Sequence, residues 1–151
     1  MIKPTETDFP RLIDIWEKSV TATHDFISGE YIKKIKSLLP EFFEIVDLYA
    51  ATISEHGIIG FSGIAEGKIE MLFIDPRWFG QGTGKLLVEH AIKKINATQV
   101  DVNEQNTGAY KFYRKMGFRI VSRSETDSMG KPYPILHLSY QPSGTLNTAK
   151  S

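Results

Sequence analysis

The chain has 151 residues, with 18 basic and 18 acidic side chains, so its formal net charge is zero and its pI is near 6.9. This balance argues against a polyanion-binding surface, so we expect no nucleic-acid partner. The absence of cysteine excludes disulfides, thiolate metal sites and a cysteine nucleophile. No apolar run approaches the roughly 20 residues of a membrane span and no signal pattern begins the chain, so we expect a cytoplasmic protein without a membrane partner. The length predicts one domain over 1–140, followed by a polar, flexible tail over 141–151.

The first 46 residues predict one short edge strand and two helices. Each helix has apolar residues at helical spacing and therefore one face to bury. Asp8 is the expected N-cap of the first helix and Ser28 that of the second. Pro40 has no N–H to donate, so it is expected to end the second helix or to begin another short turn over 41–46. The edge strand is expected over 2–5, and Pro4 limits it.

The rest of the chain alternates strands and helices. The expected strands cover residues 48–53, 58–64, 69–74, 99–103, 118–124 and 135–140, with one helix after the glycines near residue 82 and another over 107–116. A helix connects the strand over 69–74 to the strand over 99–103, so these two should run parallel. The sequence thus predicts a mixed α/β fold. Its central, mostly antiparallel sheet has six or seven strands, and about four helices accompany it.

The most informative segment is Gly80-Gln-Gly-Thr-Gly84, which lies where a strand gives way to a helix. Glycine lets the backbone approach a ligand closely, and the first N–H groups of a helix attract phosphate. Lys85 adds a positive charge beside them. The alternative is a tight turn with no ligand. The P-loop pattern fails at Phe79 and Leu86, and the dinucleotide pattern G-x-G-x-x-G fails because Lys85 or Leu87 takes its last position.

Two motifs together resemble the GNAT N-acetyltransferases. The segment 79–84 is similar to their acyl-CoA loop, Q/R-x-x-G-x-G/A, with Phe79 in place of the usual Gln or Arg. The segment 106–118 resembles the signature N-x-x-A-x-x-F-Y-x-x-x-G-F and fills every marked position. Shorter segments near residues 22–26, 102–106 and 130–134 resemble a small bacterial subgroup. The resemblance implies the GNAT fold, with the parallel strand pair splayed around acyl-CoA.

The same resemblance implies a division of labour in binding acetyl-CoA. The backbone of one strand would pair with the pantetheine arm, loop N–H groups would hold the pyrophosphate, and Asn106 would bind the pantetheine. The implied cofactor-binding residues are Leu72, Phe73, Ile74, Phe79, Gly80, Gln81, Gly82, Thr83, Gly84, Lys85 and Asn106. Tyr113 would protonate the departing thiolate as general acid. The alternative for Tyr113 is a core residue on an apolar helix face.

The implied reaction is direct attack of an amine on the thioester through a tetrahedral intermediate. The amine must be neutral to attack, so it needs a base or a water chain that leads to one. Glu70 is one candidate base, and a solvated strand residue is the alternative. His24 is another candidate base, and with Asp25 and Phe26 it lies in the segment expected to bind the acceptor. The alternative for His24 is a capping or merely exposed histidine.

The remaining histidines, His56, His90 and His137, are expected to have structural or solvated roles, and no pair of them has zinc-like spacing, so no metal site is expected. The sequence therefore predicts an acetyl-CoA-dependent N-acetyltransferase acting on an unidentified amine, with CoA as product. The acceptor is a small molecule or a protein amine, and the protein is a monomer or homodimer. The alternative function is an acyl-CoA-binding sensor without turnover.

Overall fold

The computed structural model describes residues 1–23 and 27–142, and the chain divides into two compact units, Met1–Ala97 (unit 1) and Thr98–Ser151 (unit 2). The described residues form four α-helices, six strands and two short 3₁₀ turns, in the predicted order. None of these helices is long and apolar enough to pass through a bilayer. His24, Asp25 and Phe26, and most of the predicted tail, from residue 143 onward, lie outside the described residues.

Unit 1 is built on a meander of three antiparallel strands: β1 (Asp47–Ile53), β2 (Gly57–Ala65) and β3 (Lys68–Ile74). The predicted strands are confirmed to within one residue at each end. The two tight turns between them use the left-handed backbone region, at Glu55 and Gly57 in the first turn and at Glu66 and Gly67 in the second.

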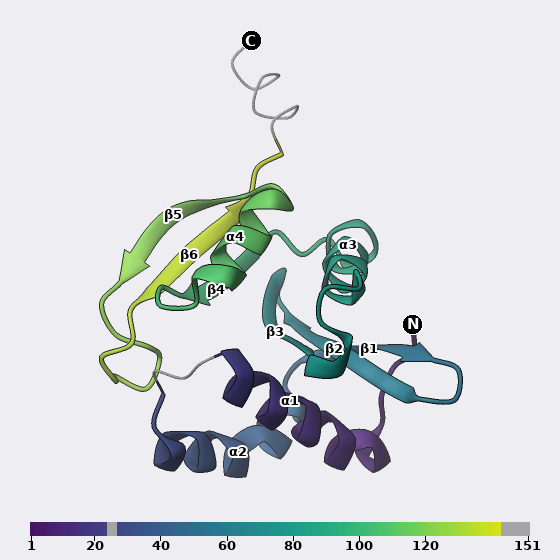
Figure 1. The fold of residues 1–151 in the computed structure, drawn as a ribbon. Helices are drawn as coiled ribbons and strands as arrows, with labels where there is room; N and C mark the ends of the chain where they lie inside the picture. Colours follow the sequence, from purple (N-terminus) through teal and green to yellow (C-terminus); the bar gives the residue numbers. More distant parts are fainter. Residues whose placement is uncertain (24–26, 143–151) are drawn as a thin grey trace. The chain divides into compact units, whose positions relative to one another are not determined.

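Three helices cover the meander: α1 (Phe9–Thr23) and α2 (Gly29–Glu44) on one face and α3 (Thr83–Ile95) on the other (Figure 1). Alternation along the strands divides the apolar residues between two clusters. Met71 and Phe73 of β3 pack with α1 and α2, whereas Leu72 and Ile74 pack with Leu87 of α3. The strand that precedes the glycines is thus held from both faces.

The N-terminus differs from the prediction in two places. The edge strand over 2–5 is only an isolated bridge, in which Ile2 and Ala50 exchange hydrogen bonds of 2.9 and 2.8 Å. Pro4 lacks the N–H that a further antiparallel pair would need. Asp8 is not a helix N-cap: it ends the 3₁₀ turn η1 (Glu6–Asp8), and its carboxylate accepts a 2.9 Å hydrogen bond from the N–H of Thr5.

The second helix confirms one prediction and corrects another. Ser28 caps α2, since its hydroxyl accepts a 3.2 Å hydrogen bond from the N–H of Tyr31. Pro40, however, neither ends the helix nor begins a new turn, because α2 continues to Glu44. Leu39 and Phe43, which flank the proline, are 2% and 3% exposed, and their burial favours a continuous helix over the loss of one hydrogen bond.

Unit 2 contains β4 (Gln99–Asn103), α4 (Thr107–Lys115), β5 (Phe118–Ser124) and β6 (Ile135–Tyr140). β6 pairs antiparallel with β4 along one edge and with β5 along the other. The start of the predicted tail joins this unit, because the N–H of Gln141 donates to the carbonyl of Gly117 at 2.7 Å.

Candidate active site

The chain leaves β3 through a buried carboxylate, Asp75, whose side chain is 0% exposed. Its Oδ2 accepts hydrogen bonds from Arg11 Nη2 at 2.9 Å and Arg77 Nη2 at 3.0 Å, and its Oδ1 accepts from the backbone N–H of Arg77 at 3.0 Å. Arg11 also donates through Nε and Nη2 to the carbonyl of Ile58, at 3.0 and 2.8 Å. These bonds join α1, β2 and the end of β3, so they fix where the glycine loop begins.

The pKa of the Asp75 carboxyl lies below its ordinary value. Burial by itself would raise this pKa, but the hydrogen bonds from Arg77 and Arg11 and the charge of Arg77 outweigh the effect of burial. The hydrogen bond to Asp75 likewise raises the pKa of the Arg77 guanidinium. Asp75 is therefore ionised at neutral pH, and its place in this cluster makes it an anchor for the loop.

The glycine loop starts after the 3₁₀ turn η2 (Pro76–Trp78) and runs into α3. Gly80 and Gly82 have φ of 75° and 85°, values that favour glycine, and Gly82 is the N-cap of α3. A Cβ atom added at either position would meet nothing within 4 Å among the described residues, so the backbone there faces open space. Glycine is thus required here by conformation, and the loop surface stays open to a ligand.

A third glycine lets α3 start close to the sheet. A Cβ atom on Gly60 of β2 would come within 2.8 Å of Ile74 Cδ1 and 3.2 Å of Thr83 Cγ2. Thr83, the first residue of α3, is 7% exposed and packs in this space. The first turn of the helix is thereby held against β2, beside the end of β3.

The N–H groups at the start of α3 suit an anion. The N–H of Leu86 donates to the carbonyl of Gly82 at 3.0 Å and makes the first bond of the helix, so the preceding N–H groups lack intrahelical acceptors. Lys85 lies exposed in this turn. Phe79 differs from the rest of the loop: its N–H donates to the carbonyl of Pro76 at 3.2 Å, and its side chain is 42% exposed. The backbone donors for an anion therefore begin at Gly80.

The predicted base Glu70 lies on β3 between two buried residues, Ile69 and Met71. Its side chain is 42% exposed, and its Oε1 is 3.9 Å from Lys68 Nζ. Leu72, Phe73 and Ile74, further along the strand, are half-buried and pair with β2 through their backbones. The residues expected to contact pantetheine thus lie on a well-ordered strand, whereas Glu70 is accessible to solvent.

In unit 2, Asn106 caps α4. Its side-chain Oδ1 accepts a 3.1 Å hydrogen bond from the N–H of Ala109, and its own N–H donates to the carbonyl of Asn103 at 2.9 Å. The side-chain oxygen therefore takes part in the helix cap. The first residue of the N-x-x-A motif thus has a structural role that its spacing to Ala109 explains.

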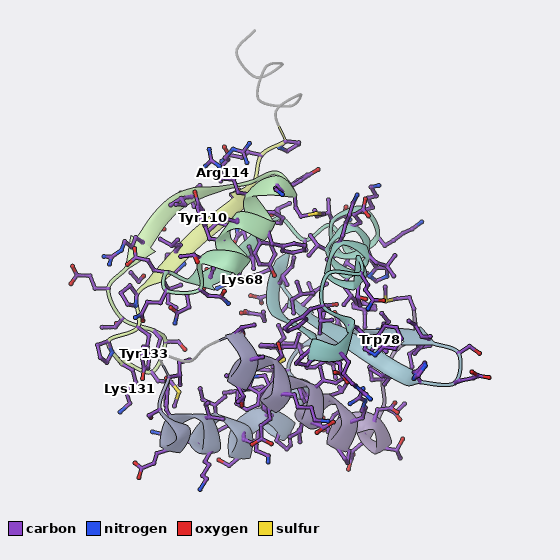
Figure 2. The ribbon with its side chains drawn as sticks, in the orientation of Figure 1. Lys68, Trp78, Tyr110, Arg114, Lys131 and Tyr133 are labelled. Carbon is purple, nitrogen blue, oxygen red and sulfur yellow. The ribbon has the colours of Figure 1, made fainter. Side chains whose placement is uncertain are left out.

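Tyr113 lies on the buried face of α4 and is 5% exposed. Its ring packs edge-on against Phe112 and Phe118, with centroid distances of 5.1 and 5.5 Å. A phenol is protonated at neutral pH, the form that a general acid needs, and burial raises the pKa of this hydroxyl further. Tyr110 lies on the same helix and accepts a 3.2 Å hydrogen bond from Arg114, one turn further on (Figure 2).

The described histidines have defined partners. His56 packs edge-on against Trp78 at 5.1 Å, and His90 packs against Tyr49 at 4.8 Å. Burial, followed by the charges of the N-terminal amine and Lys94, lowers the pKa of His90. These two rings fit the structural roles expected for them. No group of three or more His, Asp or Glu side chains in residues 1–23 and 27–142 could hold a metal ion.

His137 is the histidine whose surroundings the sequence did not indicate. Its Nδ1 lies 2.7 Å from Asp101 Oδ1 and its Nε2 lies 2.7 Å from Ser124 Oγ. Asp101 is 36 residues away in the chain and Ser124 is 13 residues away, so only the strand register brings them together. The one available signal was the polar position of each residue within an alternating strand.

Comparison with known proteins identifies the family. A family model described as an acetyltransferase (GNAT) domain matches residues 26–132. The peptidyl-lysine N-acetyltransferase YjaB of Salmonella typhimurium (strain LT2) is 45% identical over 130 residues, which make up 86% of this chain and 90% of that protein. The chain belongs to the GNAT acetyltransferase family.

Solved structures of similar proteins share its fold. The solution structure of apo YjaB from Escherichia coli has a TM-score of 0.85 and 38% sequence identity, and the match covers 94% of this chain and 99% of that one. PaiA N-acetyltransferase from Thermoplasma acidophilum, solved in complex with coenzyme A, has a TM-score of 0.67 and 25% identity, over 92% of this chain and 97% of that one. The predicted GNAT fold is therefore confirmed, and the protein is an acetyltransferase of this family.

Proposed function

We propose that this protein transfers the acetyl group of acetyl-CoA to the side-chain amine of a peptidyl lysine. The observation that carries the proposal is the 45% identity to a relative named peptidyl-lysine N-acetyltransferase, over 86% of the chain. The neighbour solved with coenzyme A supports acetyl-CoA as the donor. The open, glycine-lined start of α3 supports it too, because it offers backbone N–H groups to a pyrophosphate.

In this proposal, unit 1 provides most of the donor-binding groups. The backbone of Leu72, Phe73 and Ile74 pairs with pantetheine as an added strand would. The N–H groups of residues 80–84 hold the pyrophosphate, and Lys85 neutralises part of its charge. The side chain of Phe79 contributes van der Waals contact in place of the usual polar group. Asp75 has an indirect role in this proposal, because its hydrogen bonds set the position of the loop backbone that contacts the donor.

Unit 2 provides the proposed general acid. Acetyl-CoA supplies an activated acyl group, whose transfer releases a thiolate. Tyr113 is a phenol and is protonated at neutral pH, and burial raises its pKa further, so its hydroxyl can donate a proton to that thiolate. Phe112 and Phe118 hold the ring edge-on and limit its rotation. Asn106 starts the helix that carries Tyr113 and, in this proposal, also contacts pantetheine.

The acceptor side of the proposal rests on fewer observations. Glu70 is accessible on β3 and is a candidate base for the amine. His24, Asp25 and Phe26 are proposed to contact the acceptor, as the family resemblance implies. A lysine side chain arrives as an ammonium ion, so any acceptor site must first remove a proton from it.

The test is acetyl transfer to matched peptides, followed by mass spectrometry. One peptide has a blocked N-terminus and a single internal lysine, and its control has arginine in place of that lysine. The proposal expects acetylation of the first peptide only. Transfer to free N-termini or polyamines but not to lysine would overturn the acceptor. Binding of acetyl-CoA without transfer to any amine would favour the sensor function instead.

A further inference from the structure

A histidine on α3 lies against the sheet of unit 1 with one of its ring nitrogens buried. His90 Nδ1 is out of contact with solvent and has no hydrogen-bond partner among the described residues. The other nitrogen, Nε2, is not buried in this way, and the residue as a whole is half-buried. The imidazole therefore meets water at one nitrogen only.

The strand register shows what lies beneath this ring. Tyr49 of β1 packs edge-on against His90, with the ring centroids 4.8 Å apart. Tyr49 pairs with Ser62 of β2, and Ser62 pairs with Leu72 of β3, so these three side chains share the face that α3 covers. Ser62 is 0% exposed, and its hydroxyl oxygen is also buried without a partner in this part of the chain. The layer under the ring thus gives Nδ1 no hydrogen bond.

Cations surround this layer. Burial, followed by the charges of the N-terminal amine and Lys94, lowers the pKa of His90. Lys94 lies one turn further along α3, and the N-terminal segment also carries Lys3, whose Nζ is 4.7 Å from the centre of the Tyr49 ring. A protonated His90 would add a positive charge to a region that is already positive.

The carboxylates near this layer do not compensate for those cations. They are Asp47 on β1, Glu89 on α3 and Glu70 on β3, whereas β2 has no ionisable side chain. Asp47 is exposed to solvent, Glu89 Oε2 lies 3.7 Å from Lys93, and Glu70 Oε1 lies 3.9 Å from Lys68. No ion pair joins a carboxylate to His90 within residues 1–23 and 27–142.

Protonation of His90 therefore destabilises the contact between α3 and the sheet. The neutral ring can keep its proton on Nε2, where water accepts it, and leave Nδ1 without one. The imidazolium has a second N–H at Nδ1, and a buried donor without an acceptor is destabilising. Either the ring turns toward water or the helix moves away from the sheet.

Such a movement of α3 reaches the glycine loop, because both belong to one helix. Leu87 and Ala91, on either side of His90, are 0% exposed, so the middle of the helix is closely packed. Gly82 is the N-cap, and His90 follows it at a distance of about 12 Å along the axis. A shift of the packed helix displaces the N–H groups at its start.

We propose that His90 makes the donor site acid-sensitive: its protonation loosens α3 and weakens the binding of acetyl-CoA at the glycine loop. This inference rests on the donor site of the proposed function. By linkage, bound acetyl-CoA in turn favours the neutral ring. The phosphates of the ligand attract the imidazolium, but salt screens most of this attraction at about 12 Å. Acid thus weakens donor binding without altering a group that contacts the donor.

The pH range follows from the lowered pKa of His90. As the pH falls, the unfolded chain takes up this proton near pH 6.5, before the folded protein does. The unfolded state then binds more protons, so the free energy of unfolding is highest above about pH 6.5 and falls below it. The loss ends once the folded protein is protonated as well. Asp75 acts from about pH 4 downward, so the two effects are separate.

The first experiment measures the free energy of unfolding from about pH 8 to about pH 5 in the wild type, His90→Phe and His56→Gln. Phenylalanine keeps an aromatic ring against Tyr49 and takes up no proton. We expect His90→Phe to lose at most about half as much stability as the wild type over this range. The control should behave as the wild type, because His56 is exposed. Ser62→Ala, which removes the other unpartnered atom, should also keep the wild-type pH dependence.

The second experiment measures the Kd for acetyl-CoA by calorimetry at about pH 7.5 and about pH 5.5. A phosphate monoester of the ligand itself titrates near pH 6, so the variant supplies the correction. The Kd of the wild type should rise at least about threefold more than the Kd of His90→Phe. An NMR titration of the wild type needs no substitution: the pKa of the His90 ring should be lower than that of His56 and should fall further with acetyl-CoA bound.

Each outcome decides the inference. Stability curves of the same shape for the wild type and His90→Phe would overturn it, and so would a pKa of His90 that acetyl-CoA raises or leaves unchanged. An equal rise of Kd in both proteins would overturn the coupling to the donor site. In these cases binding of acetyl-CoA at about pH 7.5 leaves the proposed function standing. If the wild type binds no acetyl-CoA at any pH, the proposed donor site fails, and the inference fails with it.

Discussion

The two units carry chemistry of different kinds. In unit 1 the proposed ligand contacts come from the backbone, at Gly80 and Gly82, where side chains are absent and the surface is open. In unit 2 the proposed general acid is a side chain, the buried phenol of Tyr113, which packs against Phe112 and Phe118. The difference teaches that a backbone site is damaged by adding an atom, whereas a side-chain site is damaged by removing one.

The largest effect predicted for removing a single atom is at Tyr113. Tyr113→Phe removes one hydroxyl and keeps the packing against Phe112 and Phe118, so the free energy of unfolding should change little. Loss of the general acid should lower kcat about 100- to 10,000-fold, with a small change in the KM for acetyl-CoA. Steady-state kinetics with a lysine peptide measure both constants.

A matched variant sharpens this result. Tyr110→Phe removes a hydroxyl from the same helix, one that accepts a hydrogen bond from Arg114. It should leave kcat within about twofold of the wild type, because it breaks only an exposed hydrogen bond. Equal kcat values for the two variants would show that Tyr113 is a core residue and not the acid.

In unit 1 one side chain, the Asp75 carboxylate, also matters, because it positions the glycine loop. Asp75→Asn leaves the guanidinium of Arg11 without its buried partner, and removing one member of a buried pair costs about 3–5 kcal/mol. Arg77 is 68% exposed and regains water, so we expect a smaller loss in the free energy of unfolding, about 2 kcal/mol. Asp14→Asn, in which the lost carboxylate is 43% exposed, is the control and should stay within about 0.5 kcal/mol. Urea unfolding measures the free energy of unfolding of both variants. Equal losses in Asp75→Asn and Asp14→Asn would contradict a stabilising role for the buried carboxylate.

The same carboxylate predicts how stability depends on pH. Its pKa is lowered in the folded state, so its contribution is fully present above the unfolded value of about 3.9 and is lost as the pH falls below that value. The free energy of unfolding of the wild type should therefore drop from about pH 4 downward more steeply than that of Asp75→Asn. Parallel curves for the two proteins would show that Asp75 does not carry this dependence.

The sequence predicts best what is encoded locally. The strands and helices of the described residues were placed almost to the residue, because alternation and helical spacing are local patterns. The glycine loop and the helix with Tyr113 were found in the same way. Pro40 was interpreted wrongly because its local rule was overruled by the buried neighbours Leu39 and Phe43.

Local sequence patterns could not predict which side chains meet across the fold. Arg11 and Asp75 are 64 residues apart, and Asp101 and His137 are 36 residues apart. Each pair meets because strands and helices assemble in one register, which no short window of sequence specifies. His137 was accordingly expected to have a structural or solvated role. The roles proposed for Tyr113, the glycine loop, Glu70, Asn106 and the segment with His24 all stay predictions.

The smallest predicted effect concerns the side chain of Phe79. In the proposed site the loop holds acetyl-CoA through its backbone, so Phe79→Leu should change the Kd for acetyl-CoA by less than about threefold. Phe79→Arg should lower that Kd by about two- to fivefold, through a charge near the phosphates. Calorimetric titrations at two salt concentrations test this, since the gain with arginine should shrink as salt rises. Loss of most acetyl-CoA binding in Phe79→Leu would show that unit 1 also binds its ligand through a side chain, which would contradict the difference drawn between the two units.

The most direct test of the account is a thermal-shift titration with acetyl-CoA, with NAD as the unrelated nucleotide. The variants are Gly82→Asp in the loop and Gly57→Asp in the first hairpin, since both glycines have positive φ and open space around them. At 100 times Kd, the wild type and Gly57→Asp should gain about 5–10 °C with acetyl-CoA, and Gly82→Asp should gain nothing. A Gly82→Asp protein stabilised as strongly as the wild type would contradict the backbone site.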